Sequence, residues 1–178
     1  MGVSMGHLHY VVRDMEAHRK FWIDFGAAPV KVGNREMLKL PDVFIVLDRG
    51  ETSGGTEGSV VNHVAFRLPD IPRALDRFRS LGVRVLPQNP GSPIGNILTP
   101  EGERIELFHD GTENVPFHLD DGRRDVVAER LSRPMTTPVS THHFHLYLPR
   151  GQSKEAKVWL LVDPWGTSLE LTEGLSRY

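Results

Sequence analysis

HLHYVV at residues 7–12 and HVAFRL at residues 63–68 are the two stretches from which the fold of this chain can be predicted. Both are rich in β-branched and aromatic residues, a composition typical of strands. Each is followed by an aspartate able to cap a helix, by apolar residues at helical spacing, and by a glycine able to end that helix. These landmarks recur at one constant offset: His7 and His63, Asp14 and Asp70, Gly26 and Gly82. A single offset for three landmarks predicts a duplicated strand-helix unit.

Two short strands around a proline-containing turn close each unit. In the first unit they are residues 37–40 and 43–47, and in the second they are residues 96–98 and 104–108. Apolar runs on both sides of such a turn are typical of a hairpin. Each unit is therefore predicted to be a β-α-β-β-β module, and residues 50–58, rich in Gly, Ser, Thr and Glu, to be the linker between them.

A third fragment near the end repeats parts of the same unit. Residues 141–148 repeat the opening strand, and His143 and Glu170 stand where His7 and Glu106 stand in the earlier units. The middle of this unit is missing, and the second-module histidine has no counterpart in it. We therefore interpret the third module as truncated, and His143 and Glu170 as vestigial or structural residues.

The predicted organisation has three parts. They are a domain of paired β-α-β-β-β modules over residues 1–111, a linker with a helix over residues 112–139, and a partial third module over residues 140–178. A sheet edge left open by the incomplete module invites pairing with another chain, so a homodimer is expected.

Composition excludes several classes of function. The 21 basic and 23 acidic residues give a net charge of −2, which predicts no nucleic-acid binding. No apolar run approaches the roughly 18 residues needed to cross a bilayer, and no secretory signal is evident. A cytoplasmic location without membrane association is the default expectation. Because the chain has no cysteine, any metal must be held by nitrogen and oxygen atoms.

Paired modules with a histidine opening one strand and a glutamate closing another resemble the vicinal oxygen chelate superfamily. That group includes glyoxalase I, methylmalonyl-CoA epimerase, fosfomycin-resistance enzymes, extradiol dioxygenases and bleomycin-binding proteins. The resemblance covers residues 5–111 and implies an α+β fold whose curved mixed sheets form a cup around a metal. Carried over residue by residue, it assigns His7, His63 and Glu106 as metal ligands. The two modules of a cup can come from one chain or from two subunits.

This ligand set suits one divalent metal. Two neutral imidazoles and a carboxylate leave about half of an octahedral shell open, which favours Fe(II) or Mn(II), with Zn(II) or Ni(II) also possible. The resemblance implies a metal-dependent enzyme of dioxygenase, lyase or isomerase type, acting on a small substrate with vicinal oxygens. The alternative is a metal-free protein that binds a small molecule, similar to the bleomycin-resistance members.

The position equivalent to Glu106 in the first module separates the subfamilies. It falls on Leu47, or on Val46 if one residue is skipped, and neither side chain binds a metal. This argues against glyoxalase I and the epimerase, which resemble each other in using four protein ligands. The position at which extradiol dioxygenases carry a tyrosine is occupied by Asn96 here. The position at which the fosfomycin enzymes carry a threonine is occupied by His9. His9 and Asn96 are therefore the candidates for catalysis or substrate contact.

Overall fold

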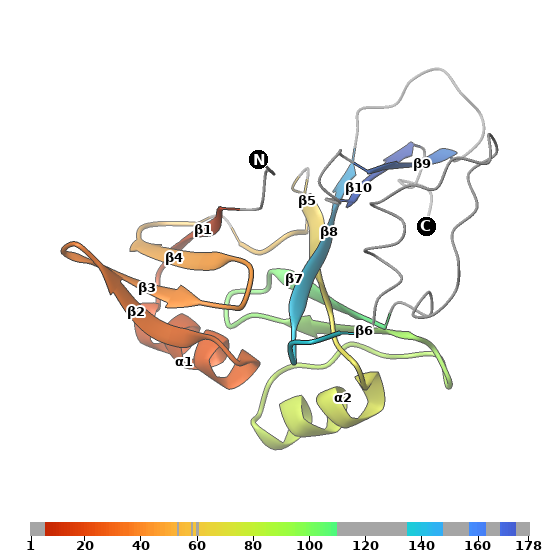
Figure 1. Ribbon diagram of the computed structural model, residues 1–178, viewed down its shortest axis with the longest axis horizontal. Helices are drawn as coiled ribbons and strands as arrows, with labels where there is room; N and C mark the ends of the chain where they lie inside the picture. The colour runs from red at the N-terminus through yellow and green to blue at the C-terminus, as the bar shows by residue number, and fades with distance from the viewer. Residues whose placement is uncertain are drawn as a thin grey trace.

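The computed structural model describes residues 6–52, 54–57, 59, 61–109, 135–147, 157–162 and 168–173. Twelve elements lie within them (Figure 1). In chain order they are β1 (His7–Val12), α1 (Met15–Phe25), β2 (Ala28–Val32), β3 (Arg35–Lys39), β4 (Phe44–Arg49), β5 (Val61–Arg67), α2 (Ile71–Ser80), β6 (Ile94–Leu98), β7 (Arg104–Phe108), β8 (Ser140–Tyr147), β9 (Lys157–Val162) and β10 (Ser168–Glu173).

The strands form two mixed sheets that lie side by side (Figure 1). The first sheet has the order β1-β4-β3-β2, and the second has the order β6-β7-β5-β8-β10-β9. In each module the opening strand is parallel to the closing strand: β1 to β4, and β5 to β7. Helix α1 packs on the first sheet and α2 on the second. This arrangement confirms the predicted α+β fold built from βαβββ modules.

The predicted helix caps form in both modules. The Asp14 carboxylate accepts a hydrogen bond from the Ala17 N–H at 2.9 Å, and the Asp70 carboxylate accepts one from the Arg73 N–H at 3.0 Å. Such a bond satisfies one of the backbone donors that a helix start leaves without a partner. At the other ends, Gly26 and Gly82 take φ values of 121° and 76°, which favour glycine. The constant offset seen in the sequence thus relates equivalent structural positions.

The second module has lost one strand of the pattern. Where β2 follows α1, the chain after α2 makes only an isolated bridge between Val85 and Ile97 among the described residues. Prolines at 87, 90 and 93 explain this loss, because each removes a backbone N–H that a strand ladder needs.

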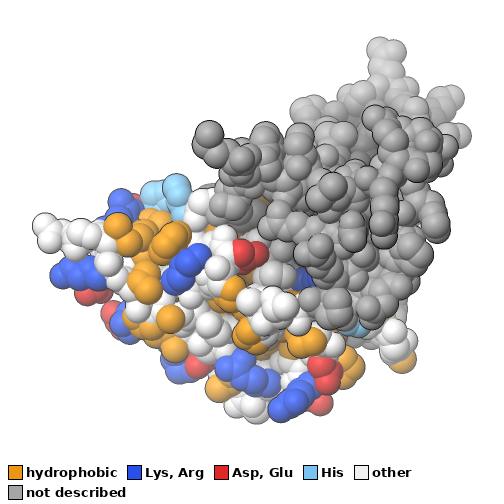
Figure 2. Space-filling view, in the orientation of Figure 1, with side chains coloured by type: hydrophobic (Ala, Val, Ile, Leu, Met, Phe, Trp, Pro, Cys, Tyr) orange, Lys and Arg blue, Asp and Glu red, His pale blue; other side chains and the backbone are white. Residues whose placement is uncertain are grey.

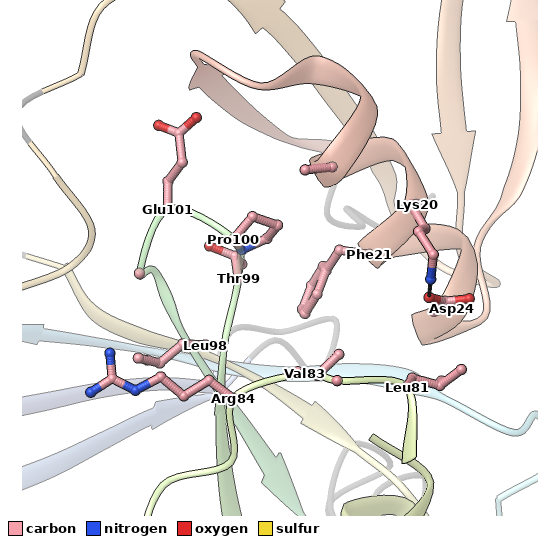
Figure 3. A pocket seen from close by; sticks show the side chains of 13 residues that line it. Lys20, Phe21, Asp24, Leu81, Val83, Arg84, Leu98, Thr99, Pro100 and Glu101 are labelled. Carbon is pink, nitrogen blue, oxygen red and sulfur yellow. Dashed lines mark hydrogen bonds and ion pairs between the residues drawn. The ribbon is translucent and has the colours of Figure 1, made fainter. Parts of the chain in front are cut away.

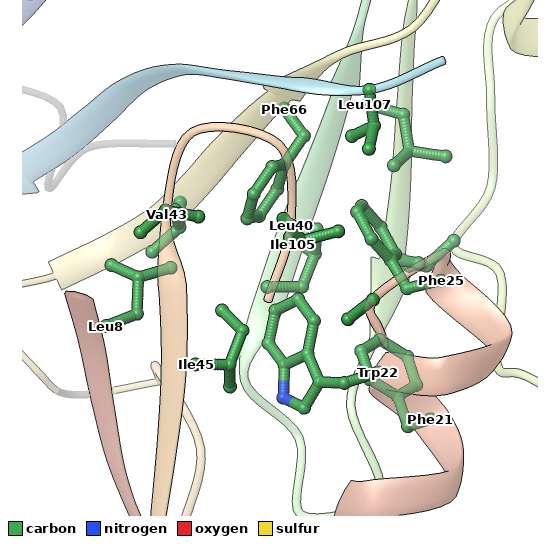
Figure 4. Close-up of a cluster of buried hydrophobic side chains, with 14 of the residues drawn as sticks. Leu8, Phe21, Trp22, Phe25, Leu40, Val43, Ile45, Phe66, Ile105 and Leu107 are labelled. Carbon is green, nitrogen blue, oxygen red and sulfur yellow. The ribbon is translucent and has the colours of Figure 1, made fainter. Parts of the chain in front are cut away.

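One aromatic core joins the two modules (Figure 4). Trp22 and Phe25 of α1 pack on Phe66 of β5, with ring centroids 5.9 and 4.9 Å apart. Phe25 also stacks on Phe78 of α2 at 5.6 Å. All four side chains are buried, so each module supplies half of a shared hydrophobic core.

The third fragment completes the second sheet. Strand β8 pairs antiparallel with β5, β10 lies parallel to β8, and β9 lies antiparallel to β10. The fragment thus repeats the β5-β7-β6 half of the sheet in reverse order, and the second module pairs edge to edge with it rather than with the first. The part of the third module that the sequence predicts to be incomplete, between β8 and β9, and the predicted linker helix before Met135 lie outside the described residues. The proposed domain boundaries stay a prediction. Among the described helices, none is long and apolar enough to span a bilayer.

Candidate metal centre

Three buried side chains converge at the centre of the second sheet: His63, Glu106 and His143. The Nε2 atoms of the two histidines lie 3.1 Å apart. Each of these nitrogens lies 3.5 Å from a different oxygen of the Glu106 carboxylate. Each residue is less than 10% exposed. This is the one group of three potential ligands with this geometry in the described part of the chain.

Strand order and register produce this convergence. Strand β5 lies between β7 and β8, so its residues have neighbours on both sides. Glu106 is paired with Ala65, and Ala65 is in turn paired with His143. His63 stands two residues before Ala65, and side chains two apart in a strand point to the same face. The three side chains therefore share one face of the sheet.

The spacing of the ligand atoms fits a metal ion. Nitrogen and oxygen ligands lie about 2.1 Å from a transition metal, so neighbouring ligands of one ion stand roughly 3.0 to 3.5 Å apart. The separations of 3.1, 3.5 and 3.5 Å fall in this range. Because two imidazoles and one carboxylate match the donors that such ions prefer, the residues present fit a divalent metal.

Neighbouring groups orient the His63 ring. Its Nδ1 lies 2.7 Å from Oδ1 of Asn62, and with the proton on Nδ1 the ring leaves the Nε2 lone pair toward Glu106 and His143. Burial, together with His143, His145 and Arg104, lowers the pKa of His63 to about 3. The ring is therefore neutral at physiological pH, which is the protonation state that a metal requires.

The remaining histidines of β8 surround the group. His145 is paired with His63 in register, and their ring centroids lie 4.8 Å apart. Nδ1 of His142 lies 2.6 Å from Nδ1 of His143. The sequence alone does not indicate His143 as a ligand, because the third fragment contains no counterpart of the second-module histidine His63. His143 stands in the third fragment where His7 stands in the first module, and this equivalence could have indicated it as a candidate ligand. The second histidine of the group, His63, comes from β5.

The other predicted site residues divide between the two sheets. Asn96 is paired with Glu106 in register, and its buried Oδ1 has no hydrogen-bond partner. His7 and His9 lie in β1, in the first sheet, and both are exposed. The structure thus brings Asn96 to the group but leaves His7 and His9 apart from it. In a single chain the third place beside His63 and Glu106 is held by His143, and the assignment of His7 as a ligand stays a prediction.

A comparison of the sequence with models of protein families identifies one superfamily. The model of the Glyoxalase/Bleomycin resistance protein/Dioxygenase superfamily matches residues 4–107, which is more than half of the chain. The chain belongs to this superfamily. A search of curated proteins finds no match.

Solved structures of the superfamily share the fold. Glyoxalase I from Zea mays, in a variant form, superposes with a TM-score of 0.59 at 15% identity, over 97% of this chain and 68% of that chain. The fosfomycin resistance protein FosX from Listeria monocytogenes superposes with a TM-score of 0.52 at 19% identity, over 64% of this chain and 95% of that chain. Both likenesses concern the fold alone.

The first module of this superfamily member lacks the closing carboxylate. In β1 and β4, His9 is paired with Val46, as Ala65 is paired with Glu106 in β5 and β7. Since His9 and Ala65 are related by the same offset as His7 and His63, Val46 rather than Leu47 holds the place of Glu106. The first module therefore offers no carboxylate at that position.

A separate cleft of about 520 Å³ opens between α1 and the turn before β7 (Figure 3). Partners already engage three of its four charged side chains, all but Arg84. Lys20 pairs with Asp24 at 2.5 Å, and the Glu101 carboxylate accepts the backbone N–H groups of Arg13 and Asp14 at 2.6 and 3.0 Å. None of the three potential metal ligands lines this cleft. The cleft is therefore separate from the candidate metal centre.

Proposed function

We propose that this chain is a divalent-metal-dependent enzyme that acts on a small substrate with two adjacent oxygen atoms. His63, Glu106 and His143 would hold the ion. The observation that carries the proposal is the buried group itself, whose three ligand atoms are spaced as around a single ion. Fe(II) or Mn(II) is favoured for this donor set, with Zn(II) or Ni(II) as alternatives.

The chemistry follows from what each group supplies. A bound divalent ion acts as a Lewis acid that draws charge from adjacent substrate oxygens. Asn62 keeps the His63 ring in the orientation needed for binding. We assign Asn96, whose buried Oδ1 has no partner, to a hydrogen bond with the substrate. We assign proton transfer to His145, because its ring lies against His63 and histidine is the most common general acid or base.

The register between β8 and β10 supports a lyase or isomerase as the reaction type of the proposed enzyme. Glu170 in β10 is paired with His145, two residues beyond His143, as Glu106 is paired with Ala65, two residues beyond His63. Glu170 therefore holds the backbone position of a second carboxylate ligand. A carboxylate ligand supplied from this position would leave less room for O2 beside a substrate than three ligands do, so the proposal favours lyase or isomerase chemistry over a dioxygenase.

Metal content tests the first part of the proposal. Protein purified without an affinity tag, loaded with Mn(II) or Zn(II) and desalted, should retain one ion per chain at this centre by elemental mass spectrometry. His63→Ala, Glu106→Gln and His143→Ala should each lose that ion, and Glu170→Gln should weaken its binding. Asn34→Ala, an exposed change in the turn before β3, is the control. Retention of the ion in His143→Ala would contradict the proposed ligand set.

Activity tests the second part. The metal-loaded protein should isomerise a hemithioacetal, followed by ultraviolet absorbance, and should take up no O2 with catechols. His145→Gln should lower kcat at least tenfold while the metal content is unchanged. Oxygen uptake with a catechol would replace the lyase or isomerase assignment with a dioxygenase.

A metal-free binding protein is the second candidate. The observation that favours it is the separation of 3.1 Å between Nε2 of His63 and Nε2 of His143, which also suits a hydrogen bond between a protonated and an unprotonated nitrogen. In that case no variant of the group changes the metal content, and ligand binding is insensitive to a chelator.

Assembly and location also belong to the proposal. We propose a homodimer, because strand β1 leaves an edge of the first sheet without a partner strand in the described part of the chain. Light scattering at a monomeric mass would contradict it. The cytoplasmic location stays a prediction.

A further inference from the structure

The first module supplies none of the three side chains of the buried group, but it contacts the strand that carries one of them. Its histidines His7 and His9 are exposed, and Figure 2 shows exposed histidine side chains at the margin of the molecule where the first sheet lies. Asp42, between β3 and β4, reaches the start of β8 instead. Its Oδ2 accepts hydrogen bonds from the N–H and the hydroxyl of Thr141, at 2.7 and 2.6 Å. The first module thus holds β8 two residues before His143.

The register between β5 and β8 shifts at the point that Asp42 holds. Ala65 stands opposite His143, whereas the next residue of β5, Phe66, stands opposite Thr141. His142 is therefore an extra residue in β8, which makes this point a β-bulge. Bulges re-aim side chains and are frequent next to active sites.

The bulge decides which face of the sheet each residue before His143 occupies. In an unbulged β8 with His143 in its present place, His142 would stand opposite Phe66. Residues directly opposite each other share a face, and the side chain of Phe66 lies in the hydrophobic core. Because of the bulge, Thr141 takes that place on the core side, where Asp42 binds it. His142 is left for the other face.

His142 lies on the face of the candidate centre. Its ring centroid is 4.6 Å from that of Phe108, which stands two residues beyond Glu106 in β7 and so shares its face. Nδ1 of His142 lies 2.6 Å from Nδ1 of His143. With the proton on Nδ1 of His143, this contact leaves the Nε2 lone pair of His143 for an ion.

A second bulge repeats this arrangement in β5. The register also shifts by one residue between Val61 and His63, which makes Asn62 the extra residue there. Asn62 contacts Nδ1 of His63 as His142 contacts Nδ1 of His143. Each histidine of the group is thus preceded by a bulged residue that engages its Nδ1. The two Nε2 atoms, 3.1 Å apart, are the ones that face each other.

We propose that Asp42 and His142 are positioning residues for His143: Asp42 holds Thr141 on the core side of β8, and the resulting bulge sets His142 against Nδ1 of His143. This inference rests on the proposed function, since the orientation of His143 matters only if it binds an ion. Hydrogen bonds to a carboxylate are stronger than those between neutral groups, so Asp42 is suited to hold the bulge. The first module thereby sets the geometry of a centre to which it gives none of the three ligands.

Metal affinity tests the role of His142. Full-length protein without a tag is titrated with Zn(II) by isothermal titration calorimetry. His142→Phe keeps a ring on Phe108 but has no nitrogen, whereas His142→Asn keeps an acceptor, as Asn62 provides for His63, but has no ring. We expect His142→Phe to weaken binding about 10- to 100-fold and His142→Asn to stay within about threefold of the parent. Any other order, or two variants that bind as tightly as the parent, would overturn this role.

A double variant tests whether Asp42 acts through His142. Asp42→Ala should weaken Zn(II) binding about as much as His142→Phe does, while Asp42→Asn, which keeps an acceptor for Thr141, should weaken it less. Asp42→Ala combined with His142→Phe should bind like His142→Phe alone, because the two residues act in one chain of contacts. Losses that add in the double variant would overturn the link.

A ring contact tests the bulge without any metal. In the metal-free parent, nuclear Overhauser effects should connect the ring protons of His142 and Phe108. Asp42→Ala should lose this contact, because His142 can then move opposite Phe66, and circular dichroism checks that the variant is folded. If it is not folded, Thr141→Val, which removes one of the two hydrogen bonds, should weaken the same contact. A contact that persists unchanged in the folded variant would overturn the proposal.

Failure of the proposed function has a different signature. In that case the parent itself binds no Zn(II), which also removes the role of His142 as a positioning residue. The ring contact between His142 and Phe108 still decides whether Asp42 holds the bulge.

Discussion

At the scale of single residues, the orientation of His63 in the candidate centre depends on Asn62, which is not one of the three potential ligands. His63 can offer its Nε2 lone pair only if the proton of the ring resides on Nδ1. The contact of 2.7 Å to Asn62 Oδ1 stabilises that tautomer, and Nη1 of Arg104 lies 3.4 Å from the same oxygen. The geometry of the centre is therefore supported by a residue one position away in the sequence.

Removing this neighbour should weaken metal binding without removing the site. We expect Asn62→Ala to lower the affinity for Mn(II) or Zn(II) about 10- to 100-fold, at an unchanged stoichiometry. Isothermal titration calorimetry measures both quantities, with Asn34→Ala as the matched control. An affinity equal to that of the parent would show that the ring needs no support from Asn62.

A second histidine makes stability depend on pH. His18 is fully buried in α1, and neither ring nitrogen has a hydrogen-bond partner in the structure. Burial lowers the pKa of His18 below its ordinary value of 6.5, although Glu101 and Asp14 act in the opposite direction. Below about pH 6.5 the unfolded chain therefore takes up a proton that the folded chain does not. The free energy of unfolding should fall as the pH drops through this window.

The variant His18→Leu should reduce this dependence. Between pH 7.5 and 5.5 the parent should lose more stability in urea denaturation than the variant, by up to about 1.4 kcal/mol per pH unit below the ordinary histidine pKa. Both proteins keep the other histidines, so the difference between their slopes isolates His18. Parallel slopes would mean that His18 titrates equally in the folded and unfolded chains.

At the scale of elements, the turn between β6 and β7 joins the modules. Glu101 in this turn is only 7% exposed, and its carboxylate accepts the N–H groups of Arg13 and Asp14 and the Thr52 hydroxyl. Burial alone would raise the pKa of Glu101, but these bonds lower it below its ordinary value. A single carboxylate of the second module thus fixes the start of α1 in the first.

Truncation of this side chain should destabilise the whole fold. We expect Glu101→Ala to lower the free energy of unfolding by about 2 to 3 kcal/mol, and Glu101→Gln by about 1 kcal/mol, because the amide keeps one acceptor but loses the charge. Asp76→Asn, which alters an exposed ion pair on α2, should cost less than about 0.5 kcal/mol. Urea denaturation compares the three. A Glu101→Ala variant as stable as Asp76→Asn would show that the turn does not join the modules.

At the scale of the whole molecule, the two sheets are one folding unit because they share an aromatic core. Phe66 of the second module contacts Trp22 and Phe25 of the first, and its side chain is fully buried. Neither module can bury these rings alone. The modules should therefore unfold together.

The change Phe66→Ala tests this coupling. We expect a loss of about 3 to 5 kcal/mol in the free energy of unfolding, with the tryptophan fluorescence and the far-ultraviolet circular dichroism changing in a single shared transition in the parent. Leu81→Ala, at an apolar residue that is 38% exposed, is the control and should cost much less. Two separate transitions in the parent would show that the modules are independent.

Local signals in the sequence are enough to specify the repeating module. The caps at Asp14 and Asp70 and the glycines at 26 and 82 act through local backbone geometry, so their constant offset predicts both helices and the strands around them. The sequence also indicates His63 and Glu106, which the structure brings to one face. It does not separate Leu47 from Val46, because strand register depends on the partner strand.

The choice of which two modules pair is made in the tertiary structure and cannot be read from local sequence patterns. His7, His63 and His143 open equivalent strands, and the sequence favours no particular pair of them. The choice follows from the edge of β5, where β8 places His143 within 3.1 Å of His63 and leaves β1 open. Hydrogen bonds between strand edges do not depend on the distance along the chain. The third member of the buried group, 80 residues from His63, is therefore fixed by the pairing of strands and not by any spacing in the sequence.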